Sequence, residues 1–233
     1  MTPPQLNPNL ARLASAAEKL EPLLGQIVFV GGCVTGLLLT DPAAPPVRPT
    51  LDVDAIVAIG SYAEFTVLEN RLRELGFHQP HTEGAPICRW TNGNLILDLM
   101  PTDASIIGFS NRWYDAALEN AQQTRVGGHE IRIITAPYFL GTKLEAFHGR
   151  GKNDFRTRDL EDIVTLIDGR PELADEVYLA PADLRKYLSS EFENLLSNGD
   201  FLEALPGHLL PDAASQQRIS LVLKRMKQLI VGG

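Results

Sequence analysis

The sequence "VFVGGCVTGLLLTDPAAPPVRPTLDVDAIV", residues 28–57, contains two features that stand out from the rest of the chain. The first is a glycine pair, Gly31 and Gly32, at the end of an apolar run. The second is Asp52 and Asp54, two acids inside another apolar run that follows a proline-rich loop. A carboxylate is costly in a buried strand unless it is paired or holds a cation. The two acids therefore indicate a use beyond packing.

The spacing of the acids predicts a metal site. Side chains two apart on a strand point to the same face, so Asp52 and Asp54 share one, with Cα atoms roughly 6.5 Å apart. A third acid, Asp98, lies in "NLILDLMP", residues 94–101, an apolar strand that has no other charge. Carboxylate oxygens are the hard ligands that Mg²⁺ prefers, usually together with substrate phosphates. The three acids therefore predict a divalent metal site.

The glycine pair predicts a phosphate site. It lies where an apolar strand, residues 26–31, passes into a segment that we expect to be helical, residues 32–40. Absent side chains let a phosphate approach the backbone, and the first amides of a helix donate to anions. Phosphate held there and metal held by the acids would together bind a nucleoside triphosphate. Taken alone, a glycine pair is also an ordinary turn, and an Asp-x-Asp strand is also a solvent-exposed face.

The remaining pattern predicts an α+β fold, a small mixed sheet flanked by helices. Hairpins are expected at residues 87–101, turning at Asn92-Gly93, and at residues 124–134, turning at Gly127-Gly128. Helices are expected at residues 9–24, 61–77 and 111–121, and two more between 136 and 169. From residue 171 the pattern is helical with polar breaks. We expect a core of residues 1–170 with an N-terminal helix, and a helical C-terminal region of residues 171–233.

Composition excludes several classes of protein. Hydrophobic residues make up 44% and charged residues 21%, as in globular proteins, and no apolar stretch reaches the roughly 20 residues of a membrane span. Residues 1–13 lack the basic start and apolar middle of a signal peptide. Cys33 and Cys88 form no CxxC pair, so a reducing cytoplasm is expected. A net charge of -8 does not favour non-specific electrostatic binding to nucleic acid, so a polyanionic partner would need a local basic patch.

One such basic patch follows the second hairpin. Its members lie within sixteen positions and are Lys143, Arg150, Lys152, Arg156 and Arg158. The cluster could hold a triphosphate or an RNA backbone, or it could be a solvated surface. Asp159 and Asp162 are three apart on a predicted helix, where they could orient Lys143 or Arg158 or cap a surface helix.

These motifs resemble the polymerase-β-like nucleotidyltransferase superfamily. In that superfamily Gly-Gly precedes a hydrophobic-Asp-x-Asp-hydrophobic strand, and a later strand carries a third Asp. Here nineteen residues, 33–51, separate Gly32 from Asp52. The form Thr50-x-Asp52-x-Asp54 is similar to the AbiEii branch, the nucleotidyltransferase toxins of abortive-infection and toxin–antitoxin systems. The segment 135–168 resembles that branch too, which has a helical lysine, a basic loop and Arg-Asp-x-x-Asp.

The resemblance covers about residues 26–169 and implies roles for individual residues. Asp52, Asp54 and Asp98 would bind Mg²⁺ or Mn²⁺, and Asp98 could accept the proton of the attacking hydroxyl. Lys143 would contact the triphosphate. The nucleotide site would also include Gly31, Gly32, Thr50, Arg158, Asp159 and Asp162.

The resemblance implies a cytoplasmic, toxin-like enzyme that moves a nucleotide from an NTP to an acceptor hydroxyl of tRNA or protein, with an antitoxin protein as a possible partner. Two alternatives stay open. One is an enzyme that modifies a small hydroxylated compound such as an aminoglycoside, and the other is a nucleotide-binding regulator without turnover.

Overall fold

A computed structural model describes residues 7–150 and 154–230 of the chain, apart from the side chain of Arg150. Contacts between Cα atoms divide it into two compact units. The sheet unit comprises the chain up to Gly36 together with Arg48–Thr135, and the helical unit comprises Leu37–Val47 together with the chain from Ala136 onwards. The division at Thr135 lies earlier than the boundary at residue 170 expected from the sequence.

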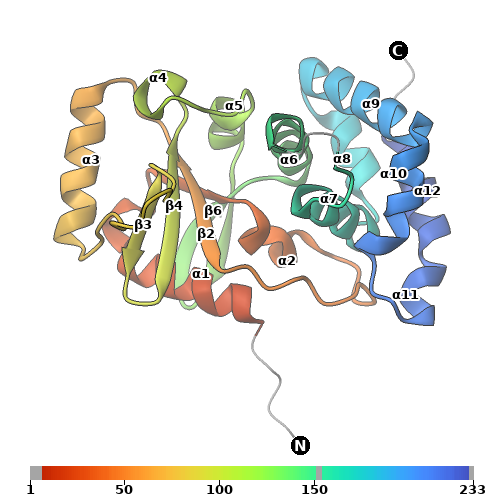
Figure 1. Ribbon diagram of the computed structural model, residues 1–233, viewed down its shortest axis with the longest axis horizontal. Helices are drawn as coiled ribbons and strands as arrows, with labels where there is room; N and C mark the ends of the chain where they lie inside the picture. The colour runs from red at the N-terminus through yellow and green to blue at the C-terminus, as the bar shows by residue number, and fades with distance from the viewer. Residues whose placement is uncertain (1–6, 151–153, 231–233) are drawn as a thin grey trace, which may run out of the picture. The chain divides into compact units, whose positions relative to one another are not determined.

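The sheet unit is built on six strands in the order β3-β4-β2-β1-β6-β5 (Figure 1). They are β1 (Ile27–Val30), β2 (Asp52–Val57), β3 (Arg89–Asn92), β4 (Leu95–Pro101), β5 (Gln122–Val126) and β6 (His129–Ile133). β2 is parallel to β4 and antiparallel to β1, and β1 is parallel to β6. The sheet is therefore mixed, which confirms the predicted α+β class.

Both predicted hairpins are present. Asn92 pairs with Leu95 and Val126 pairs with His129, so each turn leaves two residues between its strands. Gly93 has a φ of 61°, in the left-handed region that such tight turns require and that glycine adopts at little cost. The first turn fixes the register of β3 on β4 and, with it, the residue that faces Asp98.

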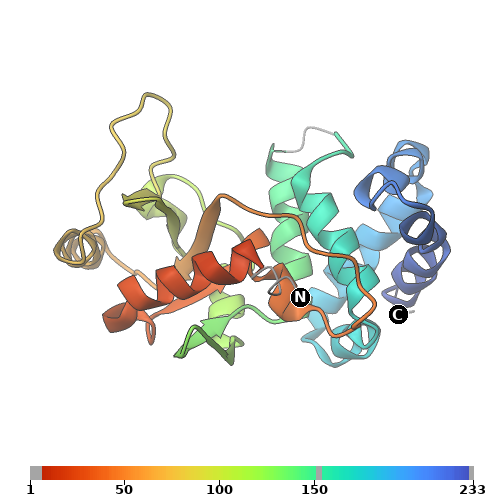
Figure 2. The same ribbon diagram turned by 90° about the horizontal axis from the view of Figure 1, so that it is seen from below.

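Helices flank the sheet. They are α1 (Pro8–Lys19), α3 (Tyr62–Glu74), α4 (Ala104–Ile107) and α5 (Tyr114–Glu119), with a 3₁₀ turn η1 (Glu21–Leu23) after α1. α1 runs along the sheet in both views and contacts β2, β4, β5 and β6 (Figures 1 and 2). Its apolar side chains Leu13, Ala16 and Ala17 are fully buried. Burial of this stripe is the main favourable term that holds the helix on the sheet.

The segment after the glycine pair differs from the expected helix. Gly32–Val34 form a 3₁₀ turn, η2, and only Thr35–Leu38 are α-helical, as α2. The proline-rich loop follows at once, and prolines lack the amide donors that would extend the helix. A helix this short has a small dipole, so the phosphate site predicted from a helix N-terminus loses that part of its support.

The helical unit contains α6 (Ala136–Arg150), α7 (Arg158–Gly169), α8 (Leu173–Leu179), α9 (Ala182–Ser197), α10 (Gly199–Ala204), η3 (Leu205–His208), α11 (Ala213–Gln217) and α12 (Ile219–Gln228). α6 contacts α7, α8 and α9, and α7 contacts α12. The first two helices thus share a core with the C-terminal helices, which is why the compact unit begins at Ala136. No helix among the residues the structure describes has both the length and the apolar character needed to cross a membrane.

The segment Leu37–Val47 belongs to the helical unit. The amides of Thr40 and Asp41 both donate to the carbonyl of Gly169, at 2.9 and 3.0 Å. Arg218 donates to the carboxylates of Asp41 and Asp168 at 3.0 and 2.7 Å. Part of the spacer between the glycine pair and Asp52 therefore packs in the helical unit.

Candidate active site

The three predicted acids lie on one face of the sheet. Asp52 and Asp54 are two apart on β2, and Asp54 is the register partner of Asp98 on the parallel strand β4. Register partners point to the same face, so the three carboxylates share it. Asp98 is buried, whereas Asp52 and Asp54 are half-buried. We call Asp52, Asp54 and Asp98 the acid face.

Gly31 packs directly against the acid face. A Cβ atom built on Gly31 would lie 2.0 Å from Oδ2 of Asp54 and 2.7 Å from its Cγ, closer than real atoms approach. Gly31 also has a φ of 71°, which side-chain-bearing residues rarely adopt. Glycine is therefore required here by Asp54 itself. The two motifs, separated by nineteen residues, form one site.

Arg89 adjoins the acid face, although no sequence pattern predicted it there. It lies on β3 as the register partner of Asp98. Its Nε and Nη2 atoms donate to Oδ1 and Oδ2 of Asp98 at 2.8 and 2.6 Å. Nη2 also lies 3.2 Å from Oδ2 of Asp52. The hydrogen bonds to Asp98 raise the pKa of Arg89, so the guanidinium stays charged.

The preceding residue, Cys88, is an inert neighbour of the site. Burial, together with the nearby charge of Asp98, raises the pKa of its thiol to about 12. A thiol with such a pKa has almost no thiolate at neutral pH, so Cys88 is a packing residue rather than a nucleophile.

The acid face offers the right donor atoms for a hard divalent cation, but Arg89 is paired with two of its three carboxylates. Among residues 7–149 and 154–230, no three His, Cys, Asp or Glu side chains gather closely enough to hold a metal ion. The residue types thus fit Mg²⁺, and their arrangement is that of an acid face already neutralised in part by a guanidinium.

Thr50 and Gly32 are also near the acid face, in structural roles. The hydroxyl of Thr50 donates to the carbonyl of Asp52 at 3.1 Å, and its amide donates to Oδ1 of Asn9 at 2.8 Å. These bonds tie the start of β2 to α1. Gly32 is buried and begins η2. A role of either residue in nucleotide binding remains a prediction.

A solved structure shares this architecture. It is the crystal structure of an antigenic nucleotidyltransferase-like protein from Paracoccidioides brasiliensis, with a TM-score of 0.52. The match covers 90% of this chain and 97% of that chain, at 18% sequence identity. The fold is nucleotidyltransferase-like. At this identity the likeness concerns the fold alone, and the chemistry has to be argued from the residues.

The likeness is found in structure only. No protein-family model matches the chain, and neither does any curated protein. The AbiEii branch suggested by the motifs therefore stays a proposal.

The predicted site residues of the helical unit gather around Lys143. The Nζ atom of Lys143, on α6, lies 3.1 Å from Asp159 and 2.6 Å from Asp162, both on α7. All three side chains are buried. The sequence left open whether the two acids orient a basic residue or cap a surface helix. In the structure they are buried and hold Lys143. Contact of Lys143 with a triphosphate remains a prediction.

The rest of the basic cluster is only partly described. Arg156 and Arg158 are exposed. Lys152 and the side chain of Arg150 lie outside the described residues. The structure thus brings Gly31 and the acid face together in the sheet unit, and it brings Lys143, Asp159 and Asp162 together in the helical unit.

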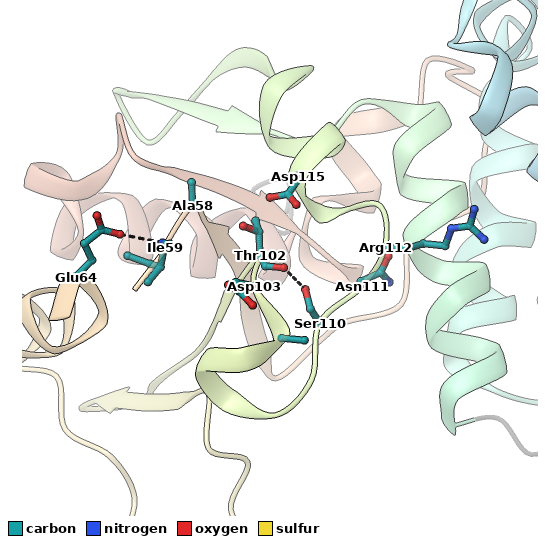
Figure 3. Close-up of a pocket in the computed structure, with 11 residues that line it drawn as sticks. Ala58, Ile59, Glu64, Thr102, Asp103, Ser110, Asn111, Arg112 and Asp115 are labelled. Atoms are coloured by element: carbon teal, nitrogen blue, oxygen red, sulfur yellow. Dashed lines mark hydrogen bonds between the residues drawn. The ribbon is translucent and has the colours of Figure 1, made fainter. Parts of the chain in front are cut away.

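A pocket of ≈ 860 Å³ in the sheet unit does not contain the acid face (Figure 3). It lies past the ends of β2 and β4, between the loops at residues 58–60 and 102–104. Ser110 donates to the carbonyl of Thr102 at 2.6 Å, and the amide of Gly60 donates to Glu64 at 2.8 Å. Three residues of β2, 55–57, lie between Asp54 and Ala58, which are thus about 13 Å apart along the strand. The pocket and the acid face are therefore distinct features.

The position of Arg89 depends on the exact register of the first hairpin. A two-residue turn between Asn92 and Leu95 pairs residues whose numbers sum to a constant, which places Arg89 opposite Asp98. The turn expected at Asn92-Gly93 would place Ile87 opposite Asp98, so the predicted hairpin does not identify the arginine.

Proposed function

We propose that this chain is a magnesium-dependent nucleotidyltransferase. It would transfer a nucleotide from an NTP to an acceptor hydroxyl, and pyrophosphate would leave. The observation that supports this function best is the acid face against Gly31 on a nucleotidyltransferase-like fold. Three carboxylates on one face of a sheet repel one another, and a divalent cation bound there would relieve the part of this repulsion that Arg89 does not offset.

The residues of the acid face have separate proposed roles. Asp52, Asp54 and Asp98 would hold the cation. A bound divalent ion would neutralise charge on the phosphates and orient the reactants. Asp98 would accept the proton of the acceptor hydroxyl. Gly31 leaves room for the Asp54 carboxylate, and β2 and β4 fix the spacing of the acids before substrate arrives.

The proposed biological role is that of an AbiEii-type toxin in the cytoplasm, controlled by an antitoxin protein. The acceptor would be tRNA or a protein. The basis for this part is the motif pattern, from Thr50-x-Asp52-x-Asp54 to Arg158-Asp159-x-x-Asp162. Lys143 would contact the triphosphate, with Asp159 and Asp162 holding its ammonium group.

The function is tested by incubating the protein with each α-labelled NTP, Mg²⁺, and either total tRNA, lysate protein or a panel of aminoglycosides. We expect label on tRNA or protein, and release of pyrophosphate. Asp54→Asn, which keeps shape and removes charge, should lower transfer at least a hundredfold, as loss of a charge-stabilising group does in other enzymes.

The control is Glu119→Gln, which removes an exposed carboxylate of α5 and should transfer label at the wild-type rate. Undiminished transfer by Asp54→Asn would defeat the assignment of the acid face. Label on aminoglycosides would instead support the small-molecule enzyme. Binding of NTP without pyrophosphate release, across all acceptors, would support the regulator.

A further inference from the structure

The side chain of Arg89 spans three neighbouring strands. Arg89, Asp98 and Asp54 are register partners across β3, β4 and β2, so they form a row on one face of the sheet. From β3 the guanidinium reaches both oxygens of Asp98 and continues to Oδ2 of Asp52 on β2. A single positive charge thus lies where carboxylates from two strands meet.

The Arg89–Asp98 ion pair is strong although it is partly exposed to solvent. A bidentate arginine–carboxylate pair is charge-assisted and geometrically specific. The side chains of Arg89 and Asp98 are 26% and 11% exposed, so solvent and salt screen the pair only in part. Without such a partner, the metal-free protein would hold three like charges on one face of two strands, and these would repel one another.

The guanidinium and a divalent cation compete for the same oxygens. A magnesium ion would lie about 2.1 Å from a carboxylate oxygen, whereas Nη2 of Arg89 lies 2.6 Å from Oδ2 of Asp98. Two cations that close to one oxygen repel each other strongly in a partly buried site. Both oxygens of Asp98 already accept from Arg89, so an ion bound at Asp98 would lie beside the guanidinium, and the repulsion between the two cations favours departure of the Arg89 side chain.

We propose that Arg89 is a built-in counter-cation that closes the acid face and that a divalent ion must displace it to bind. The inference deepens the proposed function and rests on it, because the displaced contact involves the proposed metal ligands. Arg89 holds the side chains of Asp52 and Asp98 in place while no ion is bound. It also lowers the affinity of the protein for metal, since part of the binding free energy is spent on breaking the Arg89–Asp98 pair.

The test is a titration of Mn²⁺ followed by electron paramagnetic resonance, on the wild type, Arg89→Gln and Arg125→Gln. Arg125 is an exposed arginine on β5 of the same sheet and serves as the matched control. We expect Arg89→Gln to bind Mn²⁺ roughly tenfold to a hundredfold more tightly, the worth of a lost charge-assisted hydrogen bond. Arg125→Gln should bind as the wild type does.

Thermal unfolding gives a second readout. Removing Arg89 leaves Asp98 buried without its partner, so metal-free Arg89→Gln should melt below the wild type. Mn²⁺ should then raise its Tm more than it raises that of the wild type, because tighter binding to the folded state stabilises it more. If Arg89→Gln does not fold, Arg89→Lys keeps the charge without the fork and should show a smaller gain in Mn²⁺ affinity.

Equal Mn²⁺ affinity in the three proteins, weaker binding by Arg89→Gln, or no binding by any of them would overturn the inference. The proposed function is read separately, from label transfer at saturating Mn²⁺. Transfer with equal affinities leaves the function standing and removes the role of Arg89. The opposite result is also possible: Arg89→Gln binds Mn²⁺ more tightly, Asp54→Asn abolishes this binding, and no acceptor is labelled. That result would support the role of Arg89 and remove the proposed function.

Discussion

At the scale of single residues, the site depends on one steric pair. The Cα atom of Gly31 and the carboxylate of Asp54 come so close that no side chain fits between them. The left-handed backbone of Gly31 adds a second requirement for glycine. The link between the two motifs is thus a packing constraint, which acts whether or not a phosphate is bound.

We expect Gly31→Ala to destabilise the protein by about 2–4 kcal/mol. About 1–2 kcal/mol comes from the left-handed backbone, and overlap with Asp54 adds about 1–2 kcal/mol more. Urea unfolding measures the loss. Gly25→Ala is the control, because a Cβ there meets no atom within 4 Å. A Gly31→Ala protein as stable as Gly25→Ala would show that Asp54 does not press on Gly31.

Much of this part of the fold could be predicted from sequence, for a physical reason. The alternation along residues 51–59, the apolar flanks of Asp98 and the turn at Gly93 are local signals, and each predicted its strand. Arg89 and the Gly31–Asp54 contact depend on register and on approach between strands. Such contacts are set by the assembled sheet, and a pattern along one segment does not contain them.

At the scale of elements, α6 and α7 are joined by a buried charge cluster. Lys143 faces Asp159 and Asp162 on the next helix, and the exposed fractions of the three side chains are 11%, 5% and 3%. The i, i+3 spacing of the acids was visible in the sequence, which offered Lys143 and Arg158 as partners. Only the packing of α6 on α7 shows that Lys143 is the partner. Buried charges are tolerated when they are paired, and removing one partner leaves a charge in the interior that is no longer fully compensated.

Lys143→Met should therefore cost about 3–5 kcal/mol of folding free energy, because it removes the ammonium group that pairs with two buried carboxylates. Urea unfolding of the variant measures this. The matched control is Lys186→Met, an exposed lysine on α9, whose effect should stay within about 0.5 kcal/mol. A Lys143→Met protein with wild-type stability would mean that the cluster is dispensable for the fold.

His208 gives the helical unit a pH dependence. Burial lowers its pKa below the ordinary 6.5, although the hydrogen bond of Nε2 to the carbonyl of Phe155 opposes this shift. Below pH 6.5 the unfolded chain therefore binds the proton that the folded chain resists. Stability from this group is complete above 6.5 and falls as the pH drops through that value towards the folded pKa.

Comparing the wild type with His208→Gln isolates this contribution. Between about pH 7 and pH 5.5 the unfolding free energy of the wild type should fall more steeply than that of the variant. Urea unfolding at each pH gives both curves. Parallel curves would show that His208 is protonated as easily in the folded protein as in the unfolded chain.

At the scale of the whole molecule, the chain leaves the sheet unit after Gly36 and returns at Arg48. The intervening segment is fastened to Gly169 and Arg218 of the helical unit. Both ends of this segment lead into the proposed site, to the glycine pair on one side and to Asp52 on the other. The helical unit and the acid face are therefore connected through the chain itself.

The central claim is that the acid face binds a nucleoside triphosphate together with a divalent cation. The most direct measurement is a crystal structure with a non-hydrolysable triphosphate and Mn²⁺, with the ion located by its anomalous scattering. We expect an anomalous peak bound by Asp52, Asp54 and Asp98, with the triphosphate beside it and the Arg89 guanidinium moved off Asp98. A nucleotide bound elsewhere, with Arg89 still paired to Asp98 and no peak on the acid face, would contradict it.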